Sequence, residues 1–305
     1  MLLVFSWIAC SIFFSTSYIG ANFLAKYLVP LEYTIFYRMI LSVLMLAMII
    51  LIKRDRLFIK KNEIFPSILV SMSQLSVWLG TYGAKYLISG LVPCVTILQI
   101  FVAELLSSII ERRKMRKNII FSGYLGFIGI VMLCNQQLAD IENICAKNTI
   151  IGIIFSFMST FAAAGGNIIF EKSKKTLLLM PRSTFMFYNC LFAGVFLLLL
   201  GLIVNPVDML FNVSIVDNKY LFVVAWLSLT STIIALFALY YIIEKQGAVT
   251  ATYMNFILPI ISMAISTVVE GFVWNITAIF GMIILLYSVW IGTNDRFCCK
   301  SIIRK

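Results

Sequence analysis

The sequence predicts an all-α, polytopic membrane protein, and its composition and its pattern of apolar runs carry that prediction. Of the 305 residues, 62% are hydrophobic and only 12% are charged, and the mean hydropathy is +1.01. Soluble domains carry about 25% charged residues. Apolar runs of about 20 residues, long enough to cross a hydrocarbon core about 30 Å thick as helix, recur along the whole chain. The short alternating segments of a transmembrane barrel are not evident.

Ten membrane-spanning helices are expected from these apolar runs. The first run has no basic segment before it and no cleavage-like pattern after it, which predicts a first span rather than a removable signal. The loops are short, so no soluble catalytic domain fits between the spans. The expected spans are residues 3–25, 31–52, 64–86, 90–110, 118–136, 149–170, 180–204, 219–243, 247–269 and 272–292.

Positive charge is concentrated in alternate loops. Most of the 24 Lys and Arg residues lie in the segments 53–61, 112–117 and 172–182 and in a short tail, and the net charge is +11. Short cytoplasmic loops are enriched in Lys and Arg, so both termini are expected in the cytoplasm. The Lys and Arg residues are thus distributed as in the loops of a membrane protein. We therefore expect this basic chain to contact the lipid bilayer and no nucleic acid.

The chain contains an internal repeat of five spans. The repeat divides it into a first half, 1–140, a second half, 146–293, and a basic tail, 294–305. An odd number of spans inverts the second half, and the charge bias of the corresponding loops is swapped accordingly. Four echoes occur in the same order: STSYIGANFLAKY (15–27) with STFAAAGGNIIFEK (159–172), PLEYTIFYRM (30–39) with PRSTFMFYNC (181–190), Trp78 and Tyr82 with Phe237 and Tyr241, and Glu111 with Glu270.

Inverted repeats are typical of secondary transporters, whose substrate site lies near the bilayer midplane between the halves. The five-plus-five arrangement, the proline-started second span with Arg38, the stretch GAVTATYMNFILP closed by Glu270, and the glycine-bearing fifth span GYLGFIGIVML resemble the EamA-type members of the drug/metabolite transporter superfamily. This resemblance covers nearly the whole chain. It implies a ten-helix transporter of small organic solutes with a cavity built from spans 1, 3, 4, 6, 8 and 9. The first half has Ile100 where the second has Pro259, so the fourth helix is expected to be less broken.

One polar face is expected on the third span. Gln74, Trp78 and Tyr82 are spaced i, i+4 and i+8, which places them on one side of a regular helix. They are candidates for a cavity wall, with aromatic faces for stacking and an amide for hydrogen bonding. The alternative is that they hold helices together, with Tyr82 as an interfacial anchor.

Two pairs of polar residues are related by the repeat. Asn22 and Asn167 are flanked by small residues, which permit close helix approach, so the pair either bonds across helix contacts or faces the cavity. Tyr37 and Tyr188 follow the prolines of the second and seventh spans and are further cavity candidates.

The ninth span offers Tyr253 and Asn255 shortly before Pro259. Proline removes a backbone hydrogen bond and clashes with the preceding turn, so carbonyl groups near Asn255 are expected to be freed for substrate or water. Gln99 in the fourth span is a candidate of the same type.

Two charged residues lie inside spans, where charge is costly and usually functional. Glu104 is expected to be neutral through desolvation and is the candidate for carrying a proton during transport; alternatively it faces a wet cytoplasmic vestibule. Arg38 remains charged in a protein. It either holds an anionic group of the substrate or fixes the second span to its neighbours, and Asn189 is its neutral counterpart in the second half.

The absent motifs argue against an enzyme. The chain has no histidine, which removes His-based metal sites and Ser-His catalysis, and it has no phosphate-binding loop for ATP. We therefore expect no metal and no cofactor. The sequence predicts a secondary transporter in the plasma (inner) membrane that moves a small organic metabolite, amino-acid-like and with export favoured, driven by a proton gradient. The alternative is a non-transporting membrane scaffold or a lipid- or ligand-binding membrane protein.

Overall fold

A computed structural model of the chain describes residues 2–139, 145–206, 210 and 217–302. Every regular element in these residues is a helix. Nine helical segments among them are long and apolar enough to cross a membrane, and a further apolar helix, Ile276–Gly292, is shorter. The described helices are therefore those of a multi-pass integral membrane protein.

The helices follow the expected spans closely. Two spans differ most. The sixth, expected to end at 170, continues as helix to Leu177 through the polar segment EKSKKTL, and the tenth, expected at 272–292, is the helix Ile276–Ile302, which extends into the segment 294–305 expected to be a tail. In the first half the elements are α1 (Leu2–Ala25), α2 (Leu31–Lys53), α3 (Lys61–Ser71), the 3-10 turn η1 (Met72–Gln74), α4 (Leu75–Tyr86), α5 (Leu91–Thr96), α6 (Gln99–Ile110) and α7 (Lys117–Ala139). In the second half they are α8 (Cys145–Leu177), α9 (Arg182–Val204), α10 (Asn218–Leu227), the π-helical segment η4 (Ser228–Ile234), α11 (Ala235–Gln246), α12 (Ala248–Ala251), the 3-10 segment η5 (Thr252–Phe256), α13 (Leu258–Val269) and α14 (Ile276–Ile302).

Proline starts two helices that pack against each other. Pro30 precedes α2 and Pro181 precedes α9, with φ angles of −53° and −56°. The proline ring fixes φ near the helical value and lacks an N–H, which the first turn of a helix does not need. The repeated proline in the sequence thus marks two equivalent helix starts.

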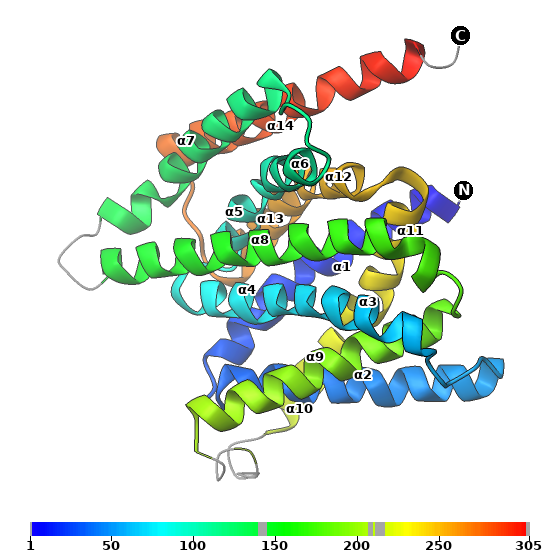
Figure 1. The fold of residues 1–305 in the computed structure, drawn as a ribbon. Helices are drawn as coiled ribbons and strands as arrows, with labels where there is room; N and C mark the ends of the chain where they lie inside the picture. Colours follow the sequence, from blue (N-terminus) through cyan, green and yellow to red (C-terminus); the bar gives the residue numbers. More distant parts are fainter. Residues whose placement is uncertain (1, 140–144, 207–209, 211–216, 303–305) are drawn as a thin grey trace.

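Long helices pair side by side around a central layer of shorter ones. Along one edge of the bundle α7 lies against α14, and along the opposite edge α2 lies against α9 (Figure 1). Between these pairs α4 packs against α8 and α1 packs against α11, while α5 contacts α13. Two large apolar clusters result, one including residues of α2, α9 and α11 and the other including residues of α5, α7 and α14.

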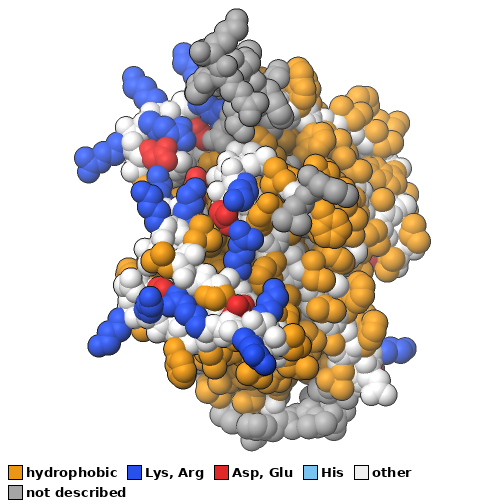
Figure 2. Space-filling model, turned by 90° about the vertical axis from the view of Figure 1, so that its right-hand side faces the viewer, with side chains coloured by type: hydrophobic (Ala, Val, Ile, Leu, Met, Phe, Trp, Pro, Cys, Tyr) orange, Lys and Arg blue, Asp and Glu red, His pale blue; other side chains and the backbone are white. Residues whose placement is uncertain are grey.

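The two ends of the bundle differ in charge. α1 begins and α14 ends toward the right of Figure 1, at the end that also holds the loops 54–60, 111–116 and 178–181. Figure 2 looks onto this end and shows Lys and Arg side chains gathered beside a broad hydrophobic flank. We call it the basic end. The opposite end holds the loops 26–30, 87–90 and 270–275.

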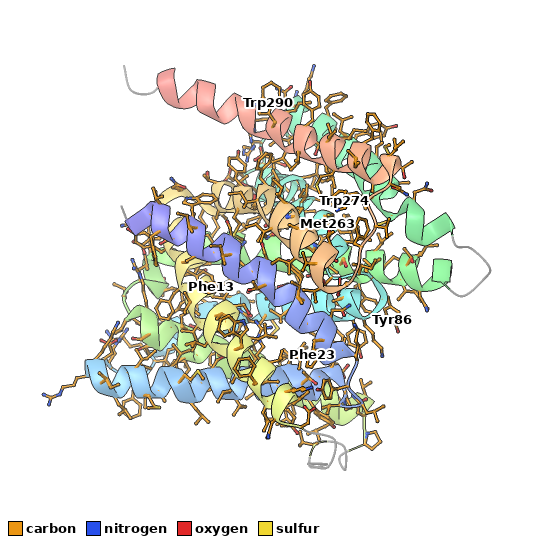
Figure 3. All side chains as sticks on the ribbon, turned by 180° about the vertical axis from the view of Figure 1, so that it is seen from behind. Phe13, Phe23, Tyr86, Met263, Trp274 and Trp290 are labelled. Carbon is orange, nitrogen blue, oxygen red and sulfur yellow. The ribbon has the colours of Figure 1, made fainter. Side chains whose placement is uncertain are left out.

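Aromatic side chains lie toward both ends of the apolar surface. Viewed from behind, Tyr86 and Trp274 lie toward the opposite end, and Trp290 lies further along α14 toward the basic end (Figure 3). Trp and Tyr are enriched where a membrane meets water. Their placement fits a bundle whose helices run from one membrane surface to the other.

Candidate functional site

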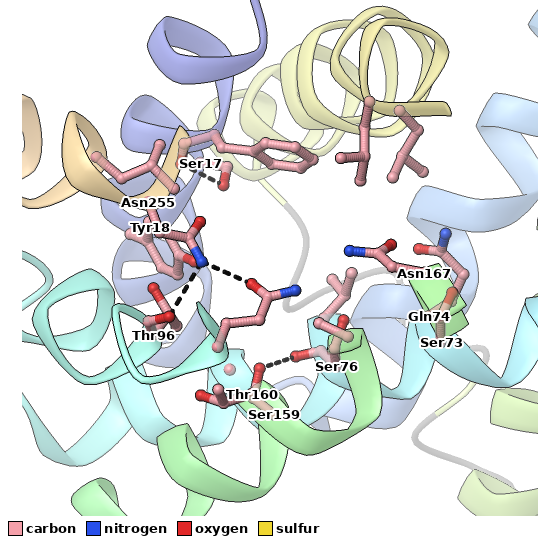
Figure 4. A pocket seen from close by; sticks show the side chains of 18 of the residues that line it. Ser17, Tyr18, Ser73, Gln74, Ser76, Thr96, Ser159, Thr160, Asn167 and Asn255 are labelled. Carbon is pink, nitrogen blue, oxygen red and sulfur yellow. Dashed lines mark hydrogen bonds between the residues drawn. The ribbon is translucent and has the colours of Figure 1, made fainter. Parts of the chain in front are cut away.

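A polar cavity lies in the middle of the bundle, where the two apolar clusters meet. The space open to the centres of water-sized molecules is about 120 Å³, which is room for several waters. Its walls come from α1, α2, η1 and α4, α5 and α6, α8, α11, and η5 and α13. Residues on both sides of it carry amide or hydroxyl groups (Figure 4). α2 joins the expected set of helices through a single lining residue, Arg38.

Two interrupted helices meet at this cavity. α5 ends at Thr96 and α6 begins at Gln99, and the 3-10 segment η5 separates α12 from α13. The Asn255 side chain in η5 donates from Nδ2 to the Thr96 carbonyl at 3.1 Å and to Gln99 Oε1 at 2.8 Å. The interruption frees the Thr96 carbonyl from the helix, so a side chain of the other half binds it (Figure 4). The fourth span is interrupted even though it has Ile100 where the ninth span has Pro259. Its gap is the shorter of the two, as the absence of the proline predicts.

A second group of polar side chains lies across the cavity, where Figure 4 shows Ser73, Gln74 and Asn167. Ser73 and Gln74 also lie beside the hydroxyl of Tyr240. That hydroxyl accepts a hydrogen bond from Asn189 Nδ2 at 2.9 Å. The opposing walls thus expose amides and hydroxyls, which can both donate and accept hydrogen bonds.

Close packing holds this second wall in place. Gly166 lies so near η1 that a Cβ atom added to it would be 1.9 Å from the Ser73 Cβ. The neighbouring Gly165 has no atom within 4 Å of its added Cβ. Small residues permit such close contact between membrane helices. Of the two glycines, Gly166 makes such a contact and Gly165 does not.

Arg38 is the cation of the cavity wall. Only 6% of the residue is exposed. Its Nε donates to Thr232 Oγ1 at 2.7 Å and its Nη2 donates to Ser231 Oγ at 2.6 Å, both in the π-helical segment η4. Within the described residues Arg38 forms no ion pair. The guanidinium is therefore held by hydroxyl groups and faces a cavity.

Trp78 and Tyr82 lie outside the cavity lining, unlike Gln74. Their Nε1 and OH groups donate to Glu32 Oε1 at 3.2 Å and 2.9 Å. Asn205 Nδ2 donates to the other oxygen of Glu32 at 3.1 Å. From Gln74 the cavity face continues through Val77 and Thr81, at i+3 and i+7. At about 100° per residue, the positions i+4 and i+8 turn Trp78 and Tyr82 away from that face by about 40° and 80°. The shared face of Gln74 with Trp78 and Tyr82 is thereby lost.

Four further candidates lie elsewhere. Asn22 Nδ2 donates to the carbonyls of Ala84 at 2.7 Å and Leu87 at 3.3 Å, so it joins α1 to the end of α4, unlike its counterpart Asn167. Three tyrosines are absent from the cavity lining: the hydroxyl of Tyr37 donates to the Leu210 carbonyl, Tyr188 packs against Phe187 and Phe192, and Tyr253 packs against the cluster around α5 and α14.

Glu104 is fully buried but lies at the basic end rather than in the cavity wall. Its Oε1 pairs with Arg113 Nη1 at 2.5 Å and with Arg116 Nε at 3.3 Å. Nearby, Glu111 pairs with Arg113 and with Lys172 of α8, each at 2.8 Å. These two cations hold the pKa of Glu111 down at about 2. Glu104, which was expected to be neutral, is therefore part of an ion-pair network.

Comparison with known proteins gives a fold and nothing finer. No family model matches the chain, and no curated protein sequence matches it. A crystal structure titled only "Crystal structure of protein" aligns over 95% of this chain and 96% of that chain, with a TM-score of 0.65 and 12% sequence identity. The fold of nearly the whole chain therefore has a counterpart among solved structures.

Several polar residues at the cavity were not identified in the sequence. Tyr18 and Thr96 line it, as do Ser159 and Thr160 of α8. The hydroxyls that hold Arg38 had a visible signal, because Ser228, Thr230, Ser231 and Thr232 are clustered within an otherwise apolar span. Amides and charges were considered in the sequence, and hydroxyl clusters were not.

Proposed function

We propose that the protein is a secondary transporter that moves a small organic metabolite across the membrane by alternating access. The observation that carries this proposal is the polar cavity at two interrupted helices, which a hydrogen bond between Asn255 and Gln99 joins in one of its walls. Interrupted helices near the midplane supply free backbone groups for substrate. A scaffold has no need of such a cavity in its centre.

The pairing of helices supports two inverted halves. α2 pairs with α9 and α7 pairs with α14, which are the second and fifth spans of each half. The contact of α4 with α8 corresponds to that of α11 with α1, with the halves exchanged. A pseudo-two-fold axis in the membrane plane accounts for this pattern. We propose that the halves rock against each other around the cavity.

The basic end is proposed to face the cytoplasm. Lys and Arg gather there (Figure 2), in agreement with the rule that cytoplasmic loops are rich in these residues. Together with the sequence resemblance, this supports an EamA-type transporter in the plasma (inner) membrane. We favour export as the direction of transport and propose that a proton gradient supplies the energy.

Flux into proteoliposomes tests the proposal. Purified protein is reconstituted, and uptake of a panel of labelled metabolites is measured with and without an imposed pH gradient, against protein-free liposomes. We expect at least one metabolite to enter only where protein is present. Asn255→Ala should lower that flux about tenfold, because it removes the hydrogen bonds that join the two interrupted helices.

The matched control is Asn275→Ala. Asn275 accepts a hydrogen bond from the Ala278 N–H at the start of α14, away from the cavity lining. Its loss should leave flux near the wild-type value. Absence of flux for every metabolite, with protein shown to be folded, would contradict the proposal and favour a non-transporting ligand-binding protein.

A further inference from the structure

We propose that the solute bound in the central cavity is a small organic monocarboxylate whose carboxylate pairs with Arg38. This inference deepens the proposed function and rests on it for the statement that the solute is transported. Binding itself is tested independently below. The inference follows from the charges, the geometry of Arg38 and the composition of the cavity wall.

The charge of Arg38 has no counter-ion in the described residues. Three buried or helix-ending carboxylates have other partners: Glu32 binds Trp78, Tyr82 and Asn205, Glu104 binds two arginines, and Glu270 binds two serines. None of the ion pairs formed by the described residues includes Arg38. A buried charge without an ion-pair partner destabilises a folded protein, and two hydroxyl groups offset only part of this loss of solvation.

One part of the guanidinium is left for a ligand. Thr232 and Ser231 occupy Nε and Nη2, whereas Nη1 makes no hydrogen bond to a residue of the described segments. Arg38 is at the same time part of the cavity wall. Arginine presents five N–H donors in a planar fork that suits a carboxylate. The hydroxyls of η4 therefore orient the guanidinium while leaving donors toward the cavity.

The wall selects for a single negative charge. Arg38 is the one charged residue among the described residues that line the cavity. A phosphate monoester, with a charge between −1.5 and −2, would leave negative charge unmatched. An amino acid would bring an ammonium group, and the described wall has no carboxylate for it. A monocarboxylate is neutralised by Arg38, and its remaining polar groups can bind neutral amides such as Gln74 and Asn167.

A purely structural Arg38 leads to a different expectation. In that case the guanidinium only joins α2 to η4, and acids and their amides should bind alike. The selectivity between an acid and its amide is thus the property that separates the two roles.

Thermal stability of the purified protein in detergent tests the proposal without requiring transport. The probes are 2-hydroxy, 2-oxo and aromatic monocarboxylic acids of three to ten carbons, each paired with its primary amide, together with glycerol phosphate and alanine. We expect at least one acid to raise Tm saturably while its amide does not. The proposal is overturned if no acid raises Tm, if amides match their acids, or if glycerol phosphate or alanine binds more tightly than every acid.

Variants locate the effect. Arg38→Gln should weaken acid binding about tenfold or more, which is the loss of one charge-assisted hydrogen bond. Arg38→Lys should bind with intermediate affinity because it keeps the charge and loses the fork. The control Arg182→Gln removes a cation that pairs with Glu244 at the basic end and should leave acid binding unchanged.

The outcomes remain separable. If Arg38→Gln does not fold, the wild-type comparison of acids with amides and the Arg38→Lys variant decide the matter. Unchanged acid affinity in a folded Arg38→Gln variant overturns the proposal. Acid binding without flux in proteoliposomes would instead remove the transport function and leave Arg38 as the anion site of a binding protein.

Discussion

Two helices, α6 and α13, end with the same Ser-x-x-x-Glu spacing in different surroundings. Each has a serine four residues before a C-terminal glutamate, Ser107 before Glu111 and Ser266 before Glu270. At the basic end Glu111 binds cations, one of them Lys172 of the second half. At the basic end this glutamate thus joins the two halves through an ion pair.

At the opposite end the corresponding glutamate, Glu270, binds neutral serines instead of cations. Glu270 Oε2 accepts hydrogen bonds from Ser266 Oγ at 2.7 Å and from the Oγ and N–H of Ser89 at 2.8 Å and 3.0 Å. Ser89 belongs to the first half, so this contact also joins the halves. Ion pairs between exposed groups are screened by salt, and short hydrogen bonds to neutral donors are screened much less. The two ends should therefore respond differently to the same change in conditions.

The largest expected effect concerns the helix contact between the two ends, where Gly166 of α8 lies against Ser73 of η1. Gly166→Ala places a methyl group 1.9 Å from the Ser73 Cβ, and overpacking of this kind costs about 3 kcal/mol. We expect a corresponding loss in the free energy of unfolding, measured by reversible unfolding in mixed detergent micelles. Gly165→Ala is the matched control, because its methyl group meets open space and alanine favours helix over glycine by up to about 1 kcal/mol. Equal stability of the two variants would contradict the close contact.

Next in size is the difference between the buried carboxylates of the two ends. Glu104 and Glu32 are 0% and 2% exposed, but the first pairs with two arginines and the second with three neutral donors. Glu104→Gln removes the ion-pair partner of Arg116 and one of the two partners of Arg113, and should cost about 3 kcal/mol. Glu32→Gln removes a buried charge that has no described counter-ion and should cost only about 1 kcal/mol.

Unfolding of both variants in the same micelles measures this difference. The reverse order, with Glu32→Gln more damaging, would show that the opposite end depends on charge more than the basic end does. In flux experiments, Glu104→Gln also tests the proton-carrying role, since pH-driven flux that persists in this variant would exclude it.

The smallest effect is expected for Glu111→Gln, and it should depend on pH. Lys172 and Arg113 lower the pKa of the Glu111 carboxyl to about 2, from an ordinary value of 4.5. A carboxyl with a lowered pKa contributes stability above its unfolded pKa and loses it as the pH falls through its folded pKa. The Tm difference between wild type and Glu111→Gln should therefore be present above pH 4.5 and shrink between pH 4.5 and 2.

Salt should act in the same direction on this contact. At 1 M salt the screening length is about 3 Å, compared with about 10 Å at 0.1 M. The Glu111→Gln effect should then disappear, whereas Glu270→Gln should keep its effect of about 1 kcal/mol. A Glu270→Gln effect that vanished with salt would remove the difference between the two ends.

Long apolar runs made most of the helices predictable from the sequence. The span expected at 31–52 forms α2, Leu31–Lys53, because proline and apolar length define both of its limits. The amides Gln74, Gln99, Asn167 and Asn255 were identified because polar groups inside an apolar span need partners or a cavity, and all four line the cavity.

The positions of Trp78 and Tyr82 could not be derived in the same way. The spacing i, i+4, i+8 drifts around an α-helix by about 40° at each step, and the cavity lies on the side of Val77 and Thr81. The ion pairs of Glu104 could not be derived either, since the arginines that pair with it follow the end of its helix and fold back. The side of a helix that faces the cavity and the return of a loop depend on tertiary contacts, which a single span does not encode.

The π-helical segment η4 has a consequence for the way this chain can change by mutation. A π-helical turn contains about one residue more than an α-helical turn, with hydrogen bonds from i to i+5. Each residue of an α-helix turns the chain by about 100°, so the extra residue rotates all of α11 by about that angle. Leu236, Leu239 and Tyr240 reach the cavity wall in this rotated register. Deletion of a single codon within 228–234 would therefore turn a different side of α11 toward the cavity, although no other residue is replaced.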